Sequence, residues 1–554
     1  MSNDFEVVDK RSRQAGPPPH LYFDILVGEE AFKLITDPKF QLAWECLYNA
    51  CPWSTVFQSK DFVSTWYQLY YPYYQAVLVK AEQEGELVGL LTLAKQKASK
   101  LLIVAGLDSA EYQTWLAKSG CGELFIQEAL DRVLTLYPGH DITFHNTPPE
   151  TPLLWAKTNK KWRERAILKP LQRPLMDLRN PDVTSLFRKK QFREKTNRLK
   201  RLGELKFEKV TDPEHFALLL DDLIAQSDFR KGAKYNFFQF EIDPYGKQFL
   251  FELFKKGILH TTVLRLDGQV IASIAAPAGN NWVHLAGLNT HSPLYAKHSP
   301  GLINFIMLGQ LLIEENMDTF DLTPGGDAYK ERLATSQDQV HELFISGVLQ
   351  TKIKKIIIEP ALSAIKSILR RKGLTPRLVK NEVLKIKGRL ALAIQHGLTK
   401  HLSWHYLWKG NSSKTLVCKF KSTKLQTEYP IKVNDVRALL RYKPSQGIYS
   451  RWDFLEDAML RFELGEQVYT LTEKGQLLVC IWHERQHGTE DIAENTLDNA
   501  PLVLRGLFIH PRVLDRLQEV LTAVVAAIHQ EDTPQQEYYF LVDERNRDAW
   551  QSLR

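Results

Sequence analysis

The order of apolar and polar positions repeats three times along this chain of 554 residues. Each repeat begins with a stretch whose apolar residues recur every three to four positions, as on one face of a helix. Two short alternating segments follow and are separated by a tight turn, which predicts a β-hairpin. A third strand, a longer helix and a last strand complete each repeat. The hairpin turns lie at 83–85, 267–268 and 473–475.

One supersecondary unit used three times explains this order economically. The pattern therefore predicts a mixed α/β fold, with units at 21–175, 176–345 and 411–554. We expect residues 1–20, which end in three prolines, to form a disordered tail. Residues 346–410 are expected to form a basic helical linker between the second and third units.

The composition is that of a globular protein, with 44% hydrophobic and 25% charged residues. No window approaches the ~18–20 consecutive apolar residues of a transmembrane helix, and no secretory signal is evident. The five cysteines are scattered, without the spacing of zinc ligands or of a disulfide framework. These observations predict a cytoplasmic protein with no metal site.

The formal net charge of +7 is distributed unevenly. Residues 350–402 contain thirteen Lys or Arg and only two acids, Glu359 and Glu382, and a second basic segment lies at 187–206. We expect both segments to be helical. Their long cationic side chains either cover apolar surface next to solvent or meet an anionic partner, which would be tRNA or an anionic membrane.

A motif in the second repeat adds a resemblance to a known family. The segment FDLTPGGDAYKERLA at 320–334 resembles the Asp-Leu…Gly…Tyr-Lys pattern of GNAT-type acetyltransferases grouped with the CelD proteins of cellulose biosynthesis. The basic segment 187–206 is similar to the helix that opens that domain, and 53–70 is similar to the family's N-terminal segment. The resemblance covers 50–345. It extends to Fem-type peptidyl transferases, which also pair two GNAT-like domains.

The resemblance implies tandem GNAT-like domains and acyl transfer from acetyl-CoA or another acyl-CoA in the second of them. GNAT enzymes hold the pyrophosphate on unpaired N–H groups at the start of their central helix. The corresponding loop here is 297–302. Ser299 is expected to cap the helix and Pro300 to be its first residue. The predicted cofactor-binding residues are Lys297, Ser299, Gly301 and Leu302.

A rival loop at 117–122 in the first repeat also carries glycines at suitable spacing. No Tyr-Lys motif follows its next strand, so we interpret it as a structural turn. In the third repeat the corresponding segment, FIHPRVLDRL, has no glycine, and Asp515 would repel a phosphate. The third unit is therefore expected to be a degenerate GNAT-like domain without its own cofactor site.

Three residues are predicted to be catalytic. Tyr329 would protonate the departing thiolate. Lys330 follows a Gly-Gly turn that can direct its ammonium into a cleft, where it would bind a phosphate or stabilise an oxyanion. His284, on the strand NWVHLAGL, is the candidate base for the acceptor, with a packed structural histidine as the alternative. The predicted substrate-binding residues are Trp282, Asn289, Asp321 and Asp327.

The leading hypothesis is acyl transfer from acyl-CoA to an amine or hydroxyl of a small-molecule or glycan acceptor. The family association suggests polysaccharide or envelope biosynthesis. A second hypothesis is a Fem-type transferase that uses aminoacyl-tRNA and meets it through the basic helices. A third is a non-catalytic GNAT-fold scaffold that docks to a membrane or to a synthase complex.

Overall fold

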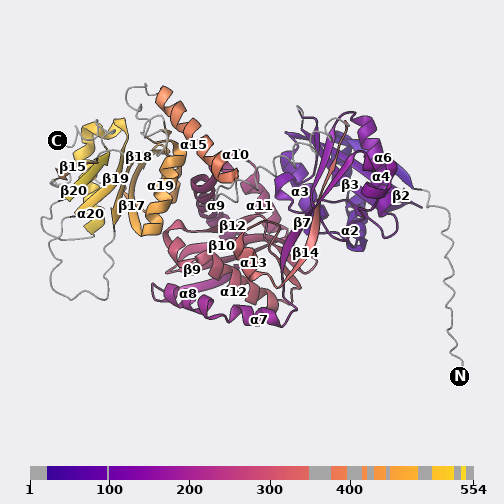
Figure 1. Ribbon diagram of the computed structural model, residues 1–554, viewed down its shortest axis with the longest axis horizontal. Coiled ribbons are helices and arrows are strands. Elements are labelled where there is room, and N and C mark those ends of the chain that lie inside the picture. Colours follow the sequence, from indigo (N-terminus) through magenta and orange to yellow (C-terminus); the bar gives the residue numbers. More distant parts are fainter. Residues whose placement is uncertain are drawn as a thin grey trace. The chain divides into compact units, whose positions relative to one another are not determined.

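The computed structural model describes most of the chain between residues 21 and 543. The described residues are 21–96, 99–348, 376–395, 415–420, 429–444, 449–484, 502–529 and 538–543. The predicted tail at 1–20 and most of the predicted linker at 346–410 lie outside them. The chain forms two compact units (Figure 1). Unit 1 comprises Met1–Gln172 and Asp338–Ile353, and unit 2 comprises Arg173–Gln337 and Lys354–Arg554.

Unit 1 contains the first repeat. Its strands follow the order β1-β2-β3-β4-β6-β14, and its helices α2, α3 and α4 contact the central strands β2 and β3. Helix α3 begins after Ser59, whose hydroxyl accepts a hydrogen bond from the Phe62 amide at 3.3 Å. The elements are β1 (Tyr22–Val27), α1 (Glu29–Thr36), α2 (Pro38–Ala50), η1 (Val56–Gln58), α3 (Lys60–Tyr70), β2 (Tyr74–Gln83), β3 (Glu86–Gln96), β4 (Leu101–Val104), η2 (Leu107–Ser109), β5 (Leu116–Ala117), α4 (Gly122–Leu136), β6 (Asp141–Thr147), α5 (Trp155–Thr158) and α6 (Lys160–Arg163).

Two long strands, β7 (Ala166–Asp177) and β14 (Ser336–Ile345), carry the chain between the units. Unit 2 continues with the second repeat, whose strands follow the order β7-β13-β11-β10-β9-β8, with β12 also paired to β10. Its elements are α7 (Asp182–Phe187), α8 (Lys190–Lys200), β8 (Leu205–Val210), α9 (Pro213–Tyr235), α10 (Gln239–Ile242), α11 (Gly246–Lys255), β9 (Leu259–Leu266), β10 (Gln269–Gly279), β11 (Trp282–His284), β12 (Leu288–His291), η3 (Pro293–His298), α12 (Pro300–Glu314), β13 (Thr319–Asp321) and α13 (Ala328–Leu333).

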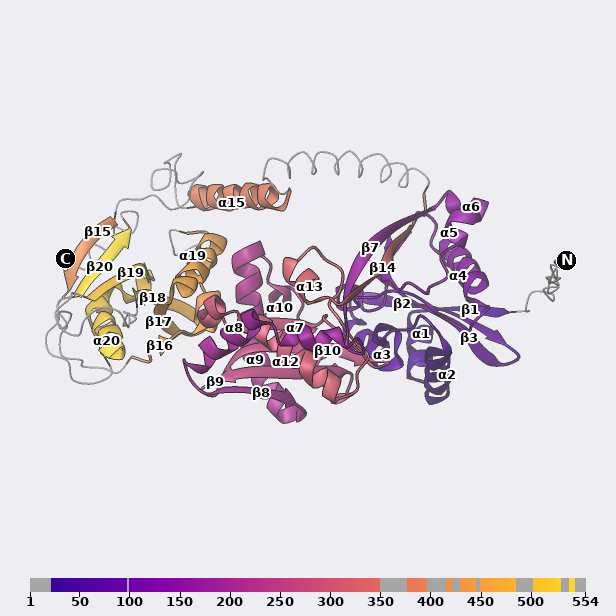
Figure 2. The same ribbon diagram turned by 60° about the horizontal axis from the view of Figure 1, so that its bottom comes forward.

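The helices of the second repeat lie on both faces of its sheet (Figures 1 and 2). Helices α7, α8 and α12 cover one face, where Ile274, Val283 and Phe320 form a core with Phe305 and Leu308 of α12. Helix α9 also contacts the sheet, at strand β12.

The third repeat forms a separate sheet within unit 2, in the order β15-β20-β19-β18-β17-β16. A shared core joins it to the second repeat, because Phe229 and Ala233 of α9 pack with Phe454 and Phe462 of α19. The elements are α15 (Pro376–Gln395), β15 (Thr415–Phe420), β16 (Lys432–Val433), α18 (Val436–Leu440), α19 (Arg451–Leu464), β17 (Glu466–Glu473), β18 (Gln476–Glu484), β19 (Leu502–Ile509), η5 (Pro511–Arg516), α20 (Leu517–His529) and β20 (Tyr538–Asp543).

The three predicted hairpins have the same turn geometry. In each, two consecutive residues have positive φ, and the second of them is glycine. This is the pattern of a type I′ turn, whose twist suits a two-residue hairpin. Each hairpin also has a register shift close to its turn. The predicted mixed α/β fold, with one hairpin in each repeat, is therefore confirmed. The turn pairs are Glu84-Gly85, Asp267-Gly268 and Lys474-Gly475.

The prediction of one helix over 187–206 is wrong at its ends. Helix α8 covers only Lys190–Lys200, and strand β8 begins at Leu205. The reason is a close contact at Gly203, where a Cβ would lie 2.0 Å from a carboxylate oxygen of Asp267. That carboxylate also accepts a hydrogen bond from the Glu204 amide at 2.7 Å. The contact ends the helix and attaches β8 to the hairpin turn.

Candidate active site

The central strands of the second repeat separate at one point. Strand β11 runs parallel to β13, and the last pair in this ladder is His284 with Asp321. Beyond it, the Ala286 amide donates to the His284 carbonyl at 2.6 Å, which turns the chain sharply. Strand β12 then continues against β10. The strands thus form a fork whose base is the His284–Asp321 pair.

Gly287 makes this fork possible. Its φ is +77°, and a Cβ at this position would lie 2.6 Å from the Ala275 carbonyl oxygen. A side chain here would therefore force apart β12 and β10 as well as strain the backbone. The kink that separates β11 from β12 depends on a residue without a Cβ.

A buried ion-pair cluster lies at the base of the fork. The Nδ1–H of His284 donates to the Asp321 carboxylate at 2.8 Å, and both side chains are almost fully buried. Arg173 of β7 lies 3.9 Å from the same carboxylate and 5.1 Å from the centre of the Trp282 ring. Asp321 therefore fixes the tautomer and the orientation of His284, as carboxylates do for catalytic histidines. The structure brings together three predicted residues, Trp282, His284 and Asp321.

The loop after β13 is tied to this cluster through Thr323. Its amide donates to Asp321 at 2.8 Å, and its φ is +61°. The Lys330 ammonium donates to the Thr323 hydroxyl at 2.9 Å, to the Thr323 carbonyl at 3.2 Å and to the Pro324 carbonyl at 3.4 Å. Lys330 is buried, so these bonds place its charge against the inner side of the loop. Its contact with a phosphate or an oxyanion stays a prediction.

Tyr329 is partly buried beside the core of α12. Its ring lies 5.5 Å from that of Phe305. Burial, assisted by the negative charge of Asp327, raises the pKa of Tyr329 to about 12, although the nearby Arg230 acts in the opposite direction. The phenol is therefore protonated at neutral pH, which a proton donor requires. Asp327 itself is exposed and sits at the N-cap position of α13, where its side chain makes no capping hydrogen bond.

The start of α12 differs from the predicted capped terminus. Ser299 occupies the N-cap position, but its φ of 57° and ψ of 49° turn its hydroxyl away from the helix amides. The hydroxyl instead accepts from the Lys195 ammonium of α8 at 3.0 Å. The expectation that the Ser299 side chain caps α12 is therefore wrong. The first-turn amides of α12 receive no bond from it, and Lys195 adds a positive charge beside them.

Gly301, in the first turn of α12, faces His291 at the end of β12. A Cβ on Gly301 would lie 3.2 Å from His291 Nδ1. Burial, together with the charge of Arg230, lowers the pKa of His291 to about 3. His291 is therefore neutral at pH 7, while Arg230 and Lys195 supply positive charge around the helix terminus. An anion here would meet N–H groups and two cations.

A buried polar group lies beneath α12. Asn304 is fully buried, and neither atom of its amide has a hydrogen-bond partner among the residues that the structure describes. The face of the sheet below it carries Asn289 and Thr262, because both pair with Ile274, whose side chain packs against α12. Buried amides normally have partners. A ligand or an ordered water beside Asn304 would satisfy this amide.

The remaining predicted residues are distributed around α12. Leu302 packs at the edge of the α12 core. Lys297 lies in the last turn of η3, and its ammonium lies 3.2 Å from the position of a Cβ on Gly465 in the third repeat. Lys297 also lines a cavity of about 850 Å³ that the second and third repeats share. Asn289 lies on the face of the sheet that α12 covers.

Besides Gly287, His291 and Arg230, four residues of the site were not predicted from the sequence. They are Arg173, Lys195, Thr323 and Asn304. Of these, only Asn304 gave a signal, since its amide interrupts the apolar residues in the first half of the helix PGLINFIMLGQLLIE. Arg173 and Lys195 take part through tertiary contacts with residues distant in the sequence, and Thr323 takes part through the local loop between Asp321 and Lys330. No group of three or more His, Cys, Asp or Glu suited to a metal occurs among the described residues.

Comparison with known proteins gives one family match, which falls on the second repeat. Residues 187–331 match the family model described as an acetyltransferase (GNAT) domain. They contain the fork, the His284–Asp321 pair, α12 and the Tyr-Lys segment. No curated protein sequence matches the chain at a significant level.

Solved structures with a similar arrangement include FemX, with 10% identity and a TM-score of 0.42 over 57% of this chain and 98% of that one. A tandem GNAT protein from the clavulanic acid biosynthesis pathway has 13% identity and a TM-score of 0.37, over 59% and 99% of the two chains. L-PGS from Bacillus licheniformis has 16% identity and a TM-score of 0.38, over 56% and 92%. Within the described residues, no helix combines the length and the apolar composition needed to cross a membrane.

Proposed function

We propose that the second repeat transfers an acyl group from an acyl-CoA thioester to an amine or hydroxyl of a small-molecule or glycan acceptor. The observation that carries this proposal is the fork, with a buried His284–Asp321 pair at its base. It lies within the segment that matches the GNAT family model. The proposal for the acceptor follows from the chemistry of this base, which suits a nucleophile that must lose a proton.

The donor fits the α12 side of the fork. The start of α12 would hold the pyrophosphate, with Gly301 permitting close approach and Lys195 adding charge. Ser299, Lys297 and Leu302 belong to the same loop. Asn304 and Asn289 offer amides to the polar arm of the donor, and Asn304 has no partner among the described residues. When bound, the donor supplies an activated acyl carbonyl.

The acceptor approaches from the opposite face. Val283 packs toward α12, so His284 and Trp282 leave β11 on the other side of the sheet. His284 takes the proton from the acceptor nitrogen or oxygen as it bonds to the acyl carbon. The carbon–sulfur bond then breaks, and Tyr329 gives its proton to the sulfur. Asp321 holds the imidazole in the required tautomer and stabilises its positive charge after the transfer.

Lys330 acts in this scheme through the loop after β13. Its three bonds to Thr323 and Pro324 hold the loop, and the Thr323 amide in turn holds Asp321. A direct contact with the donor would require the ammonium to exchange these acceptors for a phosphate or an oxyanion. The link to polysaccharide or envelope biosynthesis rests on the sequence resemblance.

Calorimetric titration with acetyl-CoA tests the donor site. A saturating donor at 100 times its Kd should stabilise the protein by about 2.7 kcal/mol, which a thermal-shift assay detects. Gly301→Asp places a carboxylate beside the pyrophosphate and should weaken binding by about 10- to 1,000-fold. Gly301→Ala is the matched control, because it adds the Cβ without the charge. Equal affinity of the Asp and Ala variants would overturn the placement.

A further inference from the structure

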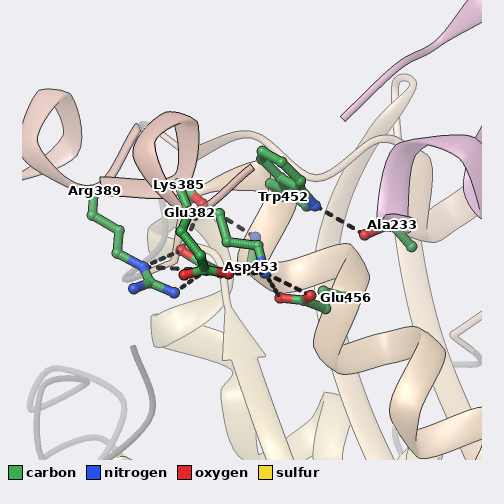
Figure 3. A network of polar contacts seen from close by, with 8 residues as sticks. Ala233, Glu382, Lys385, Arg389, Trp452, Asp453 and Glu456 are labelled. Carbon is green, nitrogen blue, oxygen red and sulfur yellow. Dashed lines mark hydrogen bonds and ion pairs between the residues drawn. The ribbon is translucent and has the colours of Figure 1, made fainter. Parts of the chain in front are cut away.

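Helix α15 has two faces of different chemistry. One face is anchored to α19 of the third repeat (Figure 3). The Arg389 guanidinium donates to both carboxylate oxygens of Asp453, at 2.7 to 3.2 Å, and both side chains are buried. The Lys385 ammonium donates to Glu456 at 2.7 and 2.8 Å. These two cations lie four residues apart and therefore on the same side of the helix.

The third repeat in turn is attached firmly to the second. The Trp452 indole N–H, one residue before Asp453, donates to the Ala233 carbonyl of α9 at 2.9 Å (Figure 3). Arg451 pairs with both carboxylate oxygens of Glu241, at 3.0 and 2.8 Å. Helix α15 is therefore fixed to the second and third repeats through α19. The face of α15 opposite Arg389 is directed away from α19.

The opposite face of α15 is apolar and exposed. Its exposed residues fall at spacings of three, four, seven and eight, which places them on one arc of the helix, turned away from Arg389. The four large aliphatic side chains on this arc are between 40% and 67% exposed, and one lysine lies among them. The arc consists of Val383, Leu384, Lys387, Leu390, Ala391 and Ile394, of which Leu384 and Ala391 lie at its edge and line a cavity with Arg451 and Trp452. We call it the outer face of α15.

The charge of α15 indicates what meets this outer face. The helix holds five Lys or Arg and one acid, Glu382, and two of these cations pair with acids of α19. A second copy of this chain would bring the same positive charge against it, which disfavours self-association. RNA would match the charge but gains nothing from four exposed aliphatic side chains. An anionic lipid surface satisfies both, since aliphatic side chains enter the acyl boundary while lysine and arginine meet the headgroups.

We infer that the outer face of α15 docks the protein onto an anionic membrane surface. The ion pairs to Asp453 and Glu456 then hold unit 2 at the membrane rather than leaving α15 as a free tether. The contact is interfacial, with the helix lying on the bilayer. This inference does not depend on the acyl transfer proposed above, because the residues involved are distinct.

Vesicle flotation of the full chain tests the inference. The wild type should float with vesicles that contain phosphatidylglycerol in phosphatidylcholine, and not with pure phosphatidylcholine vesicles. High salt should reduce the bound fraction, because surface charges are screened. The double variant L390D/I394D should bind at least about tenfold more weakly, because it places two carboxylates at the apolar contact.

A matched control separates position from composition. Leu42 of α2 and Leu218 of α9 are 62% and 79% exposed, so L42D/L218D makes the same chemical change away from α15. This control should float like the wild type. Circular dichroism and the thermal midpoint show whether each variant is folded. A third variant, L390S/I394S, removes the apolar contact without adding charge and should also float poorly.

Three results would overturn the inference. The first is absence of binding of the wild type to phosphatidylglycerol vesicles, and the second is equal flotation of the wild type and L390D/I394D. The third is a different partner, shown by a dimer in sedimentation velocity that L390D/I394D abolishes, or by RNA binding that the substitution weakens while vesicles do not bind.

Discussion

The forks of the first and second repeats have the same strand order and different contents. In unit 1 the fourth strand is also split, with β4 parallel to β6 and β5 paired to β3. The two pieces are joined by residues 105–115, where the second repeat has only 285–287. Gln113 in this longer segment makes two hydrogen bonds to the backbone of His145 in β6. Its own N–H donates to the His145 carbonyl at 2.9 Å, and its side-chain oxygen accepts from the His145 amide at 3.1 Å. The chain itself fills the first fork.

The helix starts beside the two forks differ in the same way. A Cβ on Gly122, the first residue of α4, would lie 2.7 Å from the Trp53 ring and 2.8 Å from Pro152. In the second repeat, Gly301 faces only the edge of His291, at 3.2 Å. A glycine at a helix start thus serves tight packing in unit 1, while in unit 2 it leaves the helix amides approachable. Shared topology therefore does not imply a shared site.

The base of the second fork should be the most sensitive position in the protein. We expect His284→Ala to lower kcat/KM by about 10²- to 10⁴-fold, the usual contribution of a general base. Asp321→Asn should have a similar effect, because the amide no longer holds the proton of His284 on Nδ1. Release of free thiol from acetyl-CoA in the presence of amine and hydroxyl acceptors measures both.

His145→Ala in β6 is the matched control. His145 is exposed and engages Gln113 through its backbone, so its side chain should not affect the rate. If His284→Ala keeps full activity, the fork of the second repeat is a structural feature like that of the first.

Lys330 gives the next largest expected effect. Lys330→Met should lower kcat by about 10- to 100-fold with little change in the donor KM, because the Thr323 loop and Asp321 lose support. A phosphate-clamping role would instead raise the donor KM. Steady-state kinetics at varied acetyl-CoA concentration separate these two roles. If Lys330→Met has the kcat and KM of the wild type, Lys330 has no part in the reaction. Lys330→Arg should recover little, because a guanidinium does not fit an ammonium site of this shape.

The sequence predicted the fold better than the site. The three repeats were visible because hairpin turns and apolar periods are local, and the pairs Glu84-Gly85, Asp267-Gly268 and Lys474-Gly475 carry their own conformational signal. The single helix expected over 187–206 was wrong, because the close contact between Gly203 and Asp267 depends on residues far apart in the sequence.

The candidate site could be predicted only where its residues fall in one motif. Tyr329, Lys330 and Asp321 share the segment 320–334, and His284 lies one strand away. The pairing of His284 with Asp321 depends on strand register, which periodicity does not reveal. Ser299 looked like a helix cap, but Lys195 of a distant helix binds its hydroxyl instead. Such tertiary contacts override local preference.

The two glycines at the helix starts offer a direct test of the comparison. Gly122→Ala should destabilise the protein by about 1–3 kcal/mol, because neither the Trp53 ring nor Pro152 can move without disturbing the core. Gly301→Ala should cost less than about 1 kcal/mol, because the His291 ring can shift slightly and alanine favours the helix. Thermal unfolding of both variants at one scan rate gives the order. If Gly301→Ala destabilised the protein more than Gly122→Ala, the start of α12 would be the more tightly packed of the two helix starts.

An effect that appears only as the pH falls comes from the strand beside each helix start. Four residues beyond the hairpin glycine, Gly89 pairs with Ala117 in the first repeat, and Ala272 pairs with His291 in the second. Burial, with Arg230 nearby, lowers the pKa of His291 to about 3 from an ordinary 6.5. The unfolded chain then binds a proton that the folded chain does not, so stability present above pH 6.5 is lost as the pH falls toward 3. At pH 5 the loss of stability from this residue should be about 1–2 kcal/mol.

His291→Gln removes the titrating group and should reduce the loss of stability between pH 7 and pH 5, measured by urea unfolding, by that amount. Ala117→Gly in the first repeat should leave this pH dependence unchanged. If wild type and His291→Gln lose stability in parallel between pH 7 and pH 5, His291 is accessible to solvent protons in the folded protein, and the second fork is more open than its burial indicates.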